Sequence, residues 1–247
     1  MKTKNSIAGN YRELKHSQKK GYGTPLYTRY VNRKLGQILA SIFAYWNISP
    51  NTITVISGIF TFSAYISFLL IPELKLSTAI FLYIVLVIGY GLDSADGLVS
   101  RLQQKQSGMG EWLDHTFDAI KIPLGHGVAF LLVLNQVEIE KVVQLLLLLI
   151  LTSASALFLS NILKSKLMII NTLNNKQPRG ENKHRLRSAS IFRSFLLLPL
   201  DYGIFMILFL FTPFPDLFFK IYLIWGIGFI LFTMLSFLKS GRELNRL

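Results

Sequence analysis

Residues 141–163 read KVVQLLLLLILTSASALFLSNIL, and the only charged residue in this run is Lys141 at its start. An apolar stretch of about 20 residues is long enough to cross the ~30 Å hydrocarbon core of a bilayer as a helix. A helix is the expected form because a spanning segment in lipid must satisfy its own backbone hydrogen bonds. The alternating pattern of a membrane barrel is absent. Five further apolar runs predict spans at 52–71, 77–95, 116–134, 191–212 and 217–238.

The composition supports an all-α membrane protein with six transmembrane helices. Of the 247 residues, 51% are hydrophobic and only 16% are charged, whereas about a quarter of the residues in a soluble domain are charged. The absence of cysteine excludes disulfides and thiolate metal sites. The four histidines are scattered without ligand spacing, so a metal site would be built from oxygen and would suit a hard cation.

The net charge of +13 is explained by membrane topology. If the amino terminus is cytoplasmic, 23 of the 26 Lys and Arg residues fall on the cytoplasmic side, and the exceptions are Lys75, Lys141 and Lys220. The positive-inside rule therefore predicts a multi-pass protein of a bacterial-type inner or plasma membrane, with both termini in the cytoplasm. Basic loops of this kind favour anionic lipid headgroups over nucleic acid as partners.

One catalytic domain is expected. Residues 1–24 are polar and basic and predict a disordered tail without a cleaved signal peptide. Residues 25–247 form the predicted membrane domain, which begins with an amphipathic interfacial helix at 25–45.

Acidic residues gather between the second and third predicted spans. Five of the 13 acidic residues lie between Asp93 and Asp118, and carboxylates at the ends of membrane spans indicate function. Asp93 and Asp96 share one helix face, and Asp114 and Asp118 share a stripe of the next helix. A turn near 102–109 would bring the four carboxylates together, which requires cations between them. Two Mg²⁺ or Mn²⁺ ions fit such an oxygen cluster.

Three residues beside the cluster favour a phosphate ligand. Gly97 and Gly110 lack a Cβ and allow close approach of a ligand or a helix. Arg101 can fork onto phosphate oxygens.

Residues 93–101 read DSADGLVSR and residues 110–118 read GEWLDHTFD. This pattern resembles the motif D-x-x-D-G-x-x-A-R, eight residues, G-x-x-x-D-x-x-x-D of the CDP-alcohol phosphatidyltransferase family. Seven of eight fixed positions match at the family's spacing, and Ser100 stands where alanine is usual. The six-helix architecture of the family agrees with the predicted spans.

The resemblance implies transfer of a phosphatidyl group from a CDP-linked donor to an alcohol, with release of CMP. It implies that Asp93, Asp96, Asp114 and Asp118 hold two metal ions and that Asp118 is also the general base. The residues SPNTIT at 49–54 resemble the family's Pro-Asn…Thr stretch near the nucleotide, although Asn51 could instead be a helix cap with Thr54 inside the helix. The donor site implied in this way comprises Asn51, Thr54, Asp93, Gly97, Ser100, Arg101 and Gly110.

The substrates are less well specified by the sequence. CDP-diacylglycerol is the expected donor because a lipid donor suits a site at the cytoplasmic bilayer surface. Lys164 and Lys166, with Arg193, loosely resemble the phosphate contacts of relatives that use phospho-alcohol acceptors, but all three can equally be positive-inside anchors. A soluble CDP-alcohol such as CDP-choline or CDP-ethanolamine with a diacylglycerol acceptor stays open.

A cation transporter using the acidic cluster is the competing class, but such groups usually lie near the bilayer midplane between repeats. His115 is expected to be a packing or interface residue and His126 a satisfied buried histidine, and the role of Asp201 inside a predicted span stays open. Relatives are commonly homodimers, and a homodimer is expected here. The small residues expected to allow close helix contact between the two subunits are Gly125, Gly127, Ser153 and Ser155.

Overall fold

The computed structural model describes residues 6–17, 24–174 and 197–246, and every regular element in these ranges is helical. The all-α prediction is confirmed. Within the described part, five helices are long and apolar enough to cross a membrane. They are α3 (Pro50–Leu70), α4 (Leu76–Leu102), α5 (Gly108–Gln136), α6 (Lys141–Asn174) and α9 (Pro215–Leu244).

The stretch predicted as a single span at 191–212 differs from a regular membrane helix. Its first residues, 191–196, lie outside the described part. The remainder consists of the 3₁₀ turn η2 (Leu198–Leu200), the helix α8 (Tyr202–Leu208) and the 3₁₀ turn η3 (Phe209–Phe211). The chain is extended at Asp201, with φ −80° and ψ 106°, so the helix restarts there. The apolar run is therefore divided into short segments.

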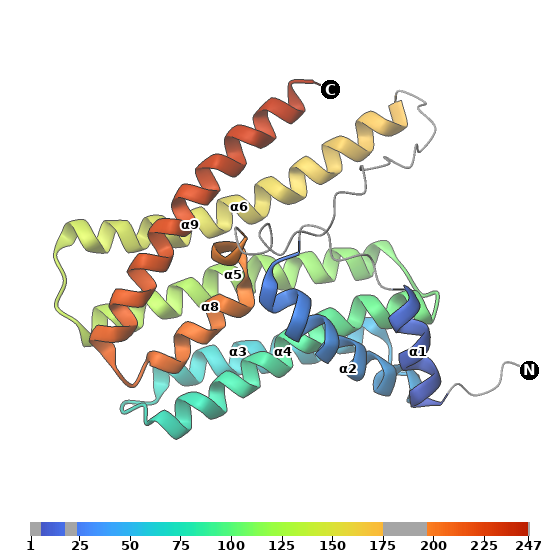
Figure 1. Ribbon diagram of the computed structural model, residues 1–247, viewed down its shortest axis with the longest axis horizontal. Coiled ribbons are helices and arrows are strands. Elements are labelled where there is room, and N and C mark those ends of the chain that lie inside the picture. Colours follow the sequence, from blue (N-terminus) through green and yellow to red (C-terminus); the bar gives the residue numbers. More distant parts are fainter. Residues whose placement is uncertain (1–5, 18–23, 175–196, 247) are drawn as a thin grey trace, which may run out of the picture.

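The helices form two groups joined by α5 (Figure 1). On one side, α3 and α4 pack together, and α4 also contacts α2 (Arg33–Tyr45). On the other side, α6 packs against α9. α5 contacts α3, α6 and α9 and so connects both groups, as does the short helix α8, which contacts α4 and α9. The main core is rich in aromatic residues, including Tyr65, Phe68, Phe205, Phe209 and Tyr222.

The amino-terminal region contains more structure than its composition predicts. Helix α1 (Ile7–Ser17) lies within the tail that was expected to be disordered, and that expectation is wrong for this segment. The reason is burial of Leu14, which is 1% exposed and packs in a core cluster with Ala40 and Ile53. The helix predicted to lie at the membrane interface begins at Leu26, passes through a π-helical segment η1 (Thr28–Asn32) and continues directly into α2.

Asp201 joins this interfacial region to α8. Its Oδ2 accepts hydrogen bonds from the backbone N–H of Tyr27 at 2.7 Å and of Thr28 at 3.3 Å, and its Oδ1 accepts from Thr28 Oγ1 at 2.9 Å. The same carboxylate caps α8 through the N–H of Gly203 at 3.2 Å. Asp201 is 1% exposed, and these donors offset the cost of its burial. Its role, left open by the sequence, is to anchor the interfacial helix.

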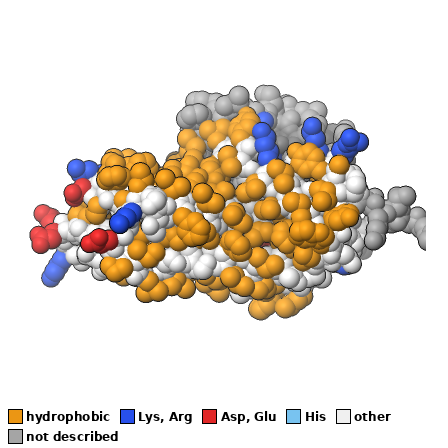
Figure 2. Space-filling view, turned by 90° about the horizontal axis from the view of Figure 1, so that it is seen from below, with side chains coloured by type: hydrophobic (Ala, Val, Ile, Leu, Met, Phe, Trp, Pro, Cys, Tyr) orange, Lys and Arg blue, Asp and Glu red, His pale blue; other side chains and the backbone are white. Residues whose placement is uncertain are grey.

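The outer surface is consistent with a lipid environment. Figure 2 shows hydrophobic side chains across the middle of the face drawn, with charged side chains toward its margins. Large exposed apolar residues occur along the long helices, for example Ile59 and Phe81 on the first two and Leu145, Ile224 and Leu231 on the last two. An exposed apolar surface of this extent is typical of contact with a membrane or with another protein, and the length and composition of the helices favour a membrane.

Candidate active site

A cleft opens where α3 and α5 begin and α4 ends. Its volume is about 700 Å³, and Asp96 and Asp114 lie in its wall. All the residues expected to contact the donor nucleotide, except Asp93, also line it. These residues are Asn51, Thr54, Gly97, Ser100, Arg101 and Gly110.

Two helix caps shape the cleft. Ser49 caps α3 by accepting a hydrogen bond from the N–H of Thr52 at 3.2 Å. Asn51 is therefore not the cap of this helix, and its side chain lies at the cleft. Ser107 caps α5 by accepting from the N–H of Gly110 at 3.0 Å, which ends the predicted turn between the two acidic stripes.

Asp96 is fixed at the floor of the cleft. Thr54 Oγ1 donates a hydrogen bond of 2.5 Å to Asp96 Oδ2, and the backbone N–H of Gly97 donates to the other oxygen of the carboxylate. Asp96 is 7% exposed, so its burial depends on these donors. The Thr54 hydroxyl thereby connects the amino-terminal part of α3 to the face of α4 that carries Asp96.

Asp93 and Asp118 are joined by a lysine that the sequence analysis did not connect with the site. Lys121 Nζ lies 2.8 Å from Asp93 Oδ1 and 2.5 Å from Asp118 Oδ1. It also lies 5.6 Å from the centre of the Tyr202 ring. The signal was present in the sequence, because Lys121 follows Asp118 by three residues and so shares its helix face.

His115 belongs to the cluster, contrary to its predicted packing role. One ligand atom from each of Asp114, His115 and Asp118 lies within 4.8 Å of the others. His115 lines the cleft, and its Nε2 lies 3.7 Å from Glu111 Oε1. Spacing alone excluded His115 because it is adjacent to Asp114 and so points away from the stripe by about 100°. Its longer side chain nevertheless reaches the same region.

The two motif glycines have different surroundings. A Cβ on Gly110 would lie 3.2 Å from Asn51 Oδ1 and 3.3 Å from Ser107 Oγ, so this position needs a small residue for helix α5 to approach Asn51. A Cβ on Gly97 would meet only Arg101 Nη1 at 3.6 Å. Gly97 therefore leaves open space on the cleft side of α4.

The structure does not bring the predicted acceptor residues together in one place. Lys166 Nζ lies 2.5 Å from Glu111 Oε1, and Glu111 lines the cleft, so Lys166 is at its rim. Lys164 is paired instead with Glu243 and lies 3.2 Å from Ser240 Oγ, both on α9. Arg193 lies outside the described residues.

The residues present fit divalent cations. Asp114, His115 and Asp118 on α5 offer ligand atoms within 4.8 Å of one another. From α4, Asp96 faces the same cleft as Asp114, and Asp93 meets Asp118 through Lys121. Such ligands suit Mg²⁺ or Mn²⁺. A cluster of four carboxylates with one direct lysine partner would otherwise carry unbalanced negative charge.

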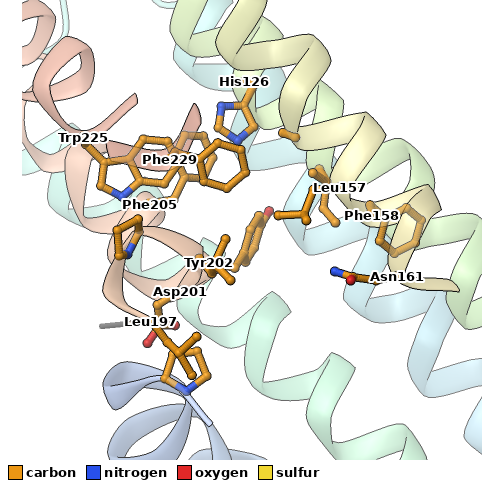
Figure 3. Close-up of a pocket in the computed structure, with 15 residues that line it drawn as sticks. His126, Leu157, Phe158, Asn161, Leu197, Asp201, Tyr202, Phe205, Trp225 and Phe229 are labelled. Carbon is orange, nitrogen blue, oxygen red and sulfur yellow. The ribbon is translucent and has the colours of Figure 1, made fainter. Parts of the chain in front are cut away.

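A second cavity of about 320 Å³ has Tyr202 in its lining and is mostly apolar. Figure 3 shows His126, Phe205, Trp225 and Phe229 gathered at one side of it, with residues of α6, including Leu157, at the other. His126 is a satisfied buried histidine, as predicted. Its Nδ1 lies 3.2 Å from the Tyr222 hydroxyl, and its ring stacks on Phe205 with 4.3 Å between centroids.

Comparison with known families agrees with this site. The CDP-alcohol phosphatidyltransferase family matches residues 47–234, which is more than half of the chain and includes all four aspartates. No curated protein matches the chain. The family is one of transferases that generally depend on divalent metal, which favours an enzyme over a cation transporter. The chain belongs to the CDP-alcohol phosphatidyltransferase family.

Proposed function

We propose that the protein transfers the phosphatidyl group of CDP-diacylglycerol to an alcohol and releases CMP, in phospholipid biosynthesis. The observation that carries this proposal is the cleft in which Asp96 and Asp114 share walls with Asn51, Thr54 and Arg101. A nucleotide and its pyrophosphate need both polar contacts and fixed positive charge, and the cleft offers both.

The donor would lie along the ends of α3 and α4. Asn51 and Thr54 would contact the nucleotide, and Arg101 would contact phosphate oxygens. Gly97 and Ser100 leave room for the donor on α4, and Gly110 lets α5 approach Asn51. Serine at position 100, where the family usually has alanine, is small enough to preserve this access.

Asp93, Asp96, Asp114 and Asp118 would hold the two divalent ions, Mg²⁺ or Mn²⁺. When bound, such ions neutralise charge that develops on the phosphates. The protein residues have a separate task, which is to hold the donor and the acceptor hydroxyl in line.

Asp118 is the proposed general base. It would take the proton of the acceptor hydroxyl while the acceptor oxygen forms a bond to the lipid-linked phosphorus. The bond between that phosphorus and the bridging oxygen breaks, and CMP leaves with the electron pair. One oxygen of Asp118 is occupied by Lys121 at 2.5 Å, so the other is the one available for this step.

The apolar cavity is suited to a lipid substrate, which in the proposed reaction is the donor. It is bounded by Tyr202, whose ring contacts Lys121, so it lies close to the carboxylates. A cavity lined by Leu157, Phe205 and Trp225 suits part of an acyl chain. CDP-choline or CDP-ethanolamine with a diacylglycerol acceptor is the alternative, and the cavity would then serve the acceptor lipid.

The acceptor is proposed to be a small water-soluble alcohol, such as glycerol phosphate or inositol phosphate. Lys166 at the rim of the cleft is the best-placed cation for its phosphate. Lys164 and Arg193 belong to the same proposed pocket, although Lys164 pairs with α9 in this structure. We expect Lys166→Ala to raise the acceptor KM, and an unchanged KM would remove Lys166 from the pocket.

Topology and assembly complete the proposal. We propose that both termini and the cleft face the cytoplasm, which the distribution of Lys and Arg favours. A homodimer is also proposed, but Gly125 cannot serve its contact, because a Cβ there would lie 2.6 Å from the Tyr65 hydroxyl within the same chain. A monomeric mass in native mass spectrometry under mild detergent would count against the dimer.

The test of the mechanism is Asp118→Asn, which keeps the size of the side chain and removes the base. We expect CMP release to fall by about a hundredfold or more. The matched control is Asp216→Asn, because Asp216 is exposed in the first turn of α9, away from the cleft. Full activity of the Asp118 variant would exclude Asp118 as the base.

A further inference from the structure

Lys121 is a buried cation inside the acidic cluster, and neither the donor site nor the proton transfer requires it. The residue is 4% exposed and bridges Asp93 on α4 with Asp118 on α5. It lies one helical turn beyond Asp118, away from the end of α5 that opens the cleft, and it does not line the cleft. An ionisable residue at such a position in a membrane helix usually has a functional partner.

The surroundings of Lys121 fix its ammonium group in this position. The group faces Asp93 and Asp118, and it lies 5.6 Å from the centre of the Tyr202 ring. Tyr202 is held in turn by a 2.7 Å hydrogen bond between its hydroxyl and that of Tyr65. Lys121 can therefore keep its charge between the two carboxylates while their remaining oxygens stay free.

The net charge of the four aspartates and Lys121 differs between the metal-free and the metal-loaded site. Four carboxylates and one lysine carry a net charge of about −3 in the metal-free cluster, so Lys121 relieves repulsion between the aspartates. Two divalent ions would bring the same cluster to about +1, and Lys121 would then repel them. The lysine thus stabilises the metal-free protein more than the metal-loaded protein.

We propose that Lys121 is a built-in counter-cation that holds Asp93 and Asp118 together in the metal-free protein and lowers the affinity of the site for divalent cations. This inference rests on the metal site of the proposed function. It makes Lys121 a positioning residue, because it acts through the carboxylates and need not touch a substrate. Its role is to let the acidic cluster fold before the metal arrives.

The test compares Lys121→Met with the wild-type protein, using Mn²⁺ alone and no donor or acceptor. Mn²⁺ binding is measured from the electron paramagnetic resonance signal of the free ion, and Tm is measured in detergent with EDTA and with saturating Mn²⁺. We expect Mn²⁺ affinity to rise about tenfold in the variant. We expect its Tm to fall in EDTA and to recover more than the wild-type Tm when Mn²⁺ is added.

Two further variants separate charge from packing. Lys121→Arg keeps the charge and should keep Mn²⁺ affinity near that of the wild type. If the Met variant cannot be purified, the Arg variant is compared with the wild type in the same two measurements. Lys239→Met is the matched control, because Lys239 is 75% exposed on α9. Its Mn²⁺ affinity and Tm should not change.

Three results would overturn the proposal. They are an unchanged or weaker Mn²⁺ affinity in Lys121→Met, an Arg variant that departs from wild type as far as the Met variant does, and a wild-type protein that binds no Mn²⁺. If the variants behave as expected but no CDP-linked donor yields CMP, the proposed transfer fails and the role of Lys121 stands.

Discussion

Thr54 on α3 donates a 2.5 Å hydrogen bond to Asp96 on α4, and this bond is the direct link between the proposed nucleotide wall and the metal-binding stripe. Both residues are buried, with Thr54 4% and Asp96 7% exposed. The bond joins two helices through residues that are 42 positions apart in the sequence. The position of Asp96 therefore depends on the start of α3 as well as on its own helix.

Replacing Thr54 with Val removes this hydroxyl and keeps the shape of the side chain. A buried acceptor that loses its partner costs about 1–3 kcal/mol, so we predict that kcat/KM for the donor falls by about tenfold. Steady-state CMP release measures this. The control is Thr52→Val, because Thr52 is exposed and its hydroxyl contacts only Ser49 at 2.7 Å among the described hydrogen bonds. Equal activity of the two variants would mean that Asp96 does not need Thr54.

Replacing Asp201 with Ala should destabilise the whole domain. The backbone N–H groups of Tyr27, Thr28 and Gly203 lose their acceptor, and α8 loses its cap. Loss of a cap and of buried acceptors predicts a decrease of about 2–4 kcal/mol in the free energy of unfolding, or a Tm lower by about 5–10 °C for a chain of this length. Asp216→Ala, at an exposed carboxylate, should leave Tm unchanged. A Tm within 1 °C of wild type would show that the interfacial helix is anchored by other contacts.

Filling the apolar cavity should affect the lipid substrate selectively. Ala154 is 3% exposed and lines the cavity, so Ala154→Phe would take up space proposed for an acyl chain. We predict a several-fold rise in KM for long-chain CDP-diacylglycerol and a smaller rise for a short-chain analogue, with Mn²⁺ binding unchanged. Thr152→Phe, at an exposed position of the same helix, is the control. An equal rise for both chain lengths would exclude the cavity as a chain-binding site.

The fold was largely predictable because membrane spans are set by the length of apolar runs. Helices α3, α4, α5, α6 and α9 all include the spans predicted for them, except for a shift of one residue at the end of the first. The stretch at 191–212 was not predictable from hydropathy, which does not register the break made by Pro199 and the extended backbone at Asp201. Helix α1 was missed because it is held by tertiary contacts: Leu14 is buried in a distant core cluster, and Asn10 Nδ2 donates a hydrogen bond of 3.3 Å to the Ser41 carbonyl.

The site was predictable where residues follow helical spacing. Asp96 and Asp114 face one cleft, as the stripes require. Contacts between helices were not predictable, and Lys121 is the main example, because its bond to Asp93 depends on how α5 packs beside α4. Asp201 is another, since its partners at Tyr27 and Thr28 are more than 170 residues away in sequence.

The most direct measurement of the central claim is to follow CMP and lipid together. Purified protein in mixed micelles is given CDP-diacylglycerol and a panel of alcohol acceptors, and both products are quantified by mass spectrometry. The proposed function predicts that one acceptor yields CMP and a new phospholipid in equal amounts, that EDTA stops both, and that Mg²⁺ or Mn²⁺ restores both. Release of CMP without a new phospholipid, or formation of both products at the full rate in EDTA, would contradict metal-dependent phosphatidyl transfer.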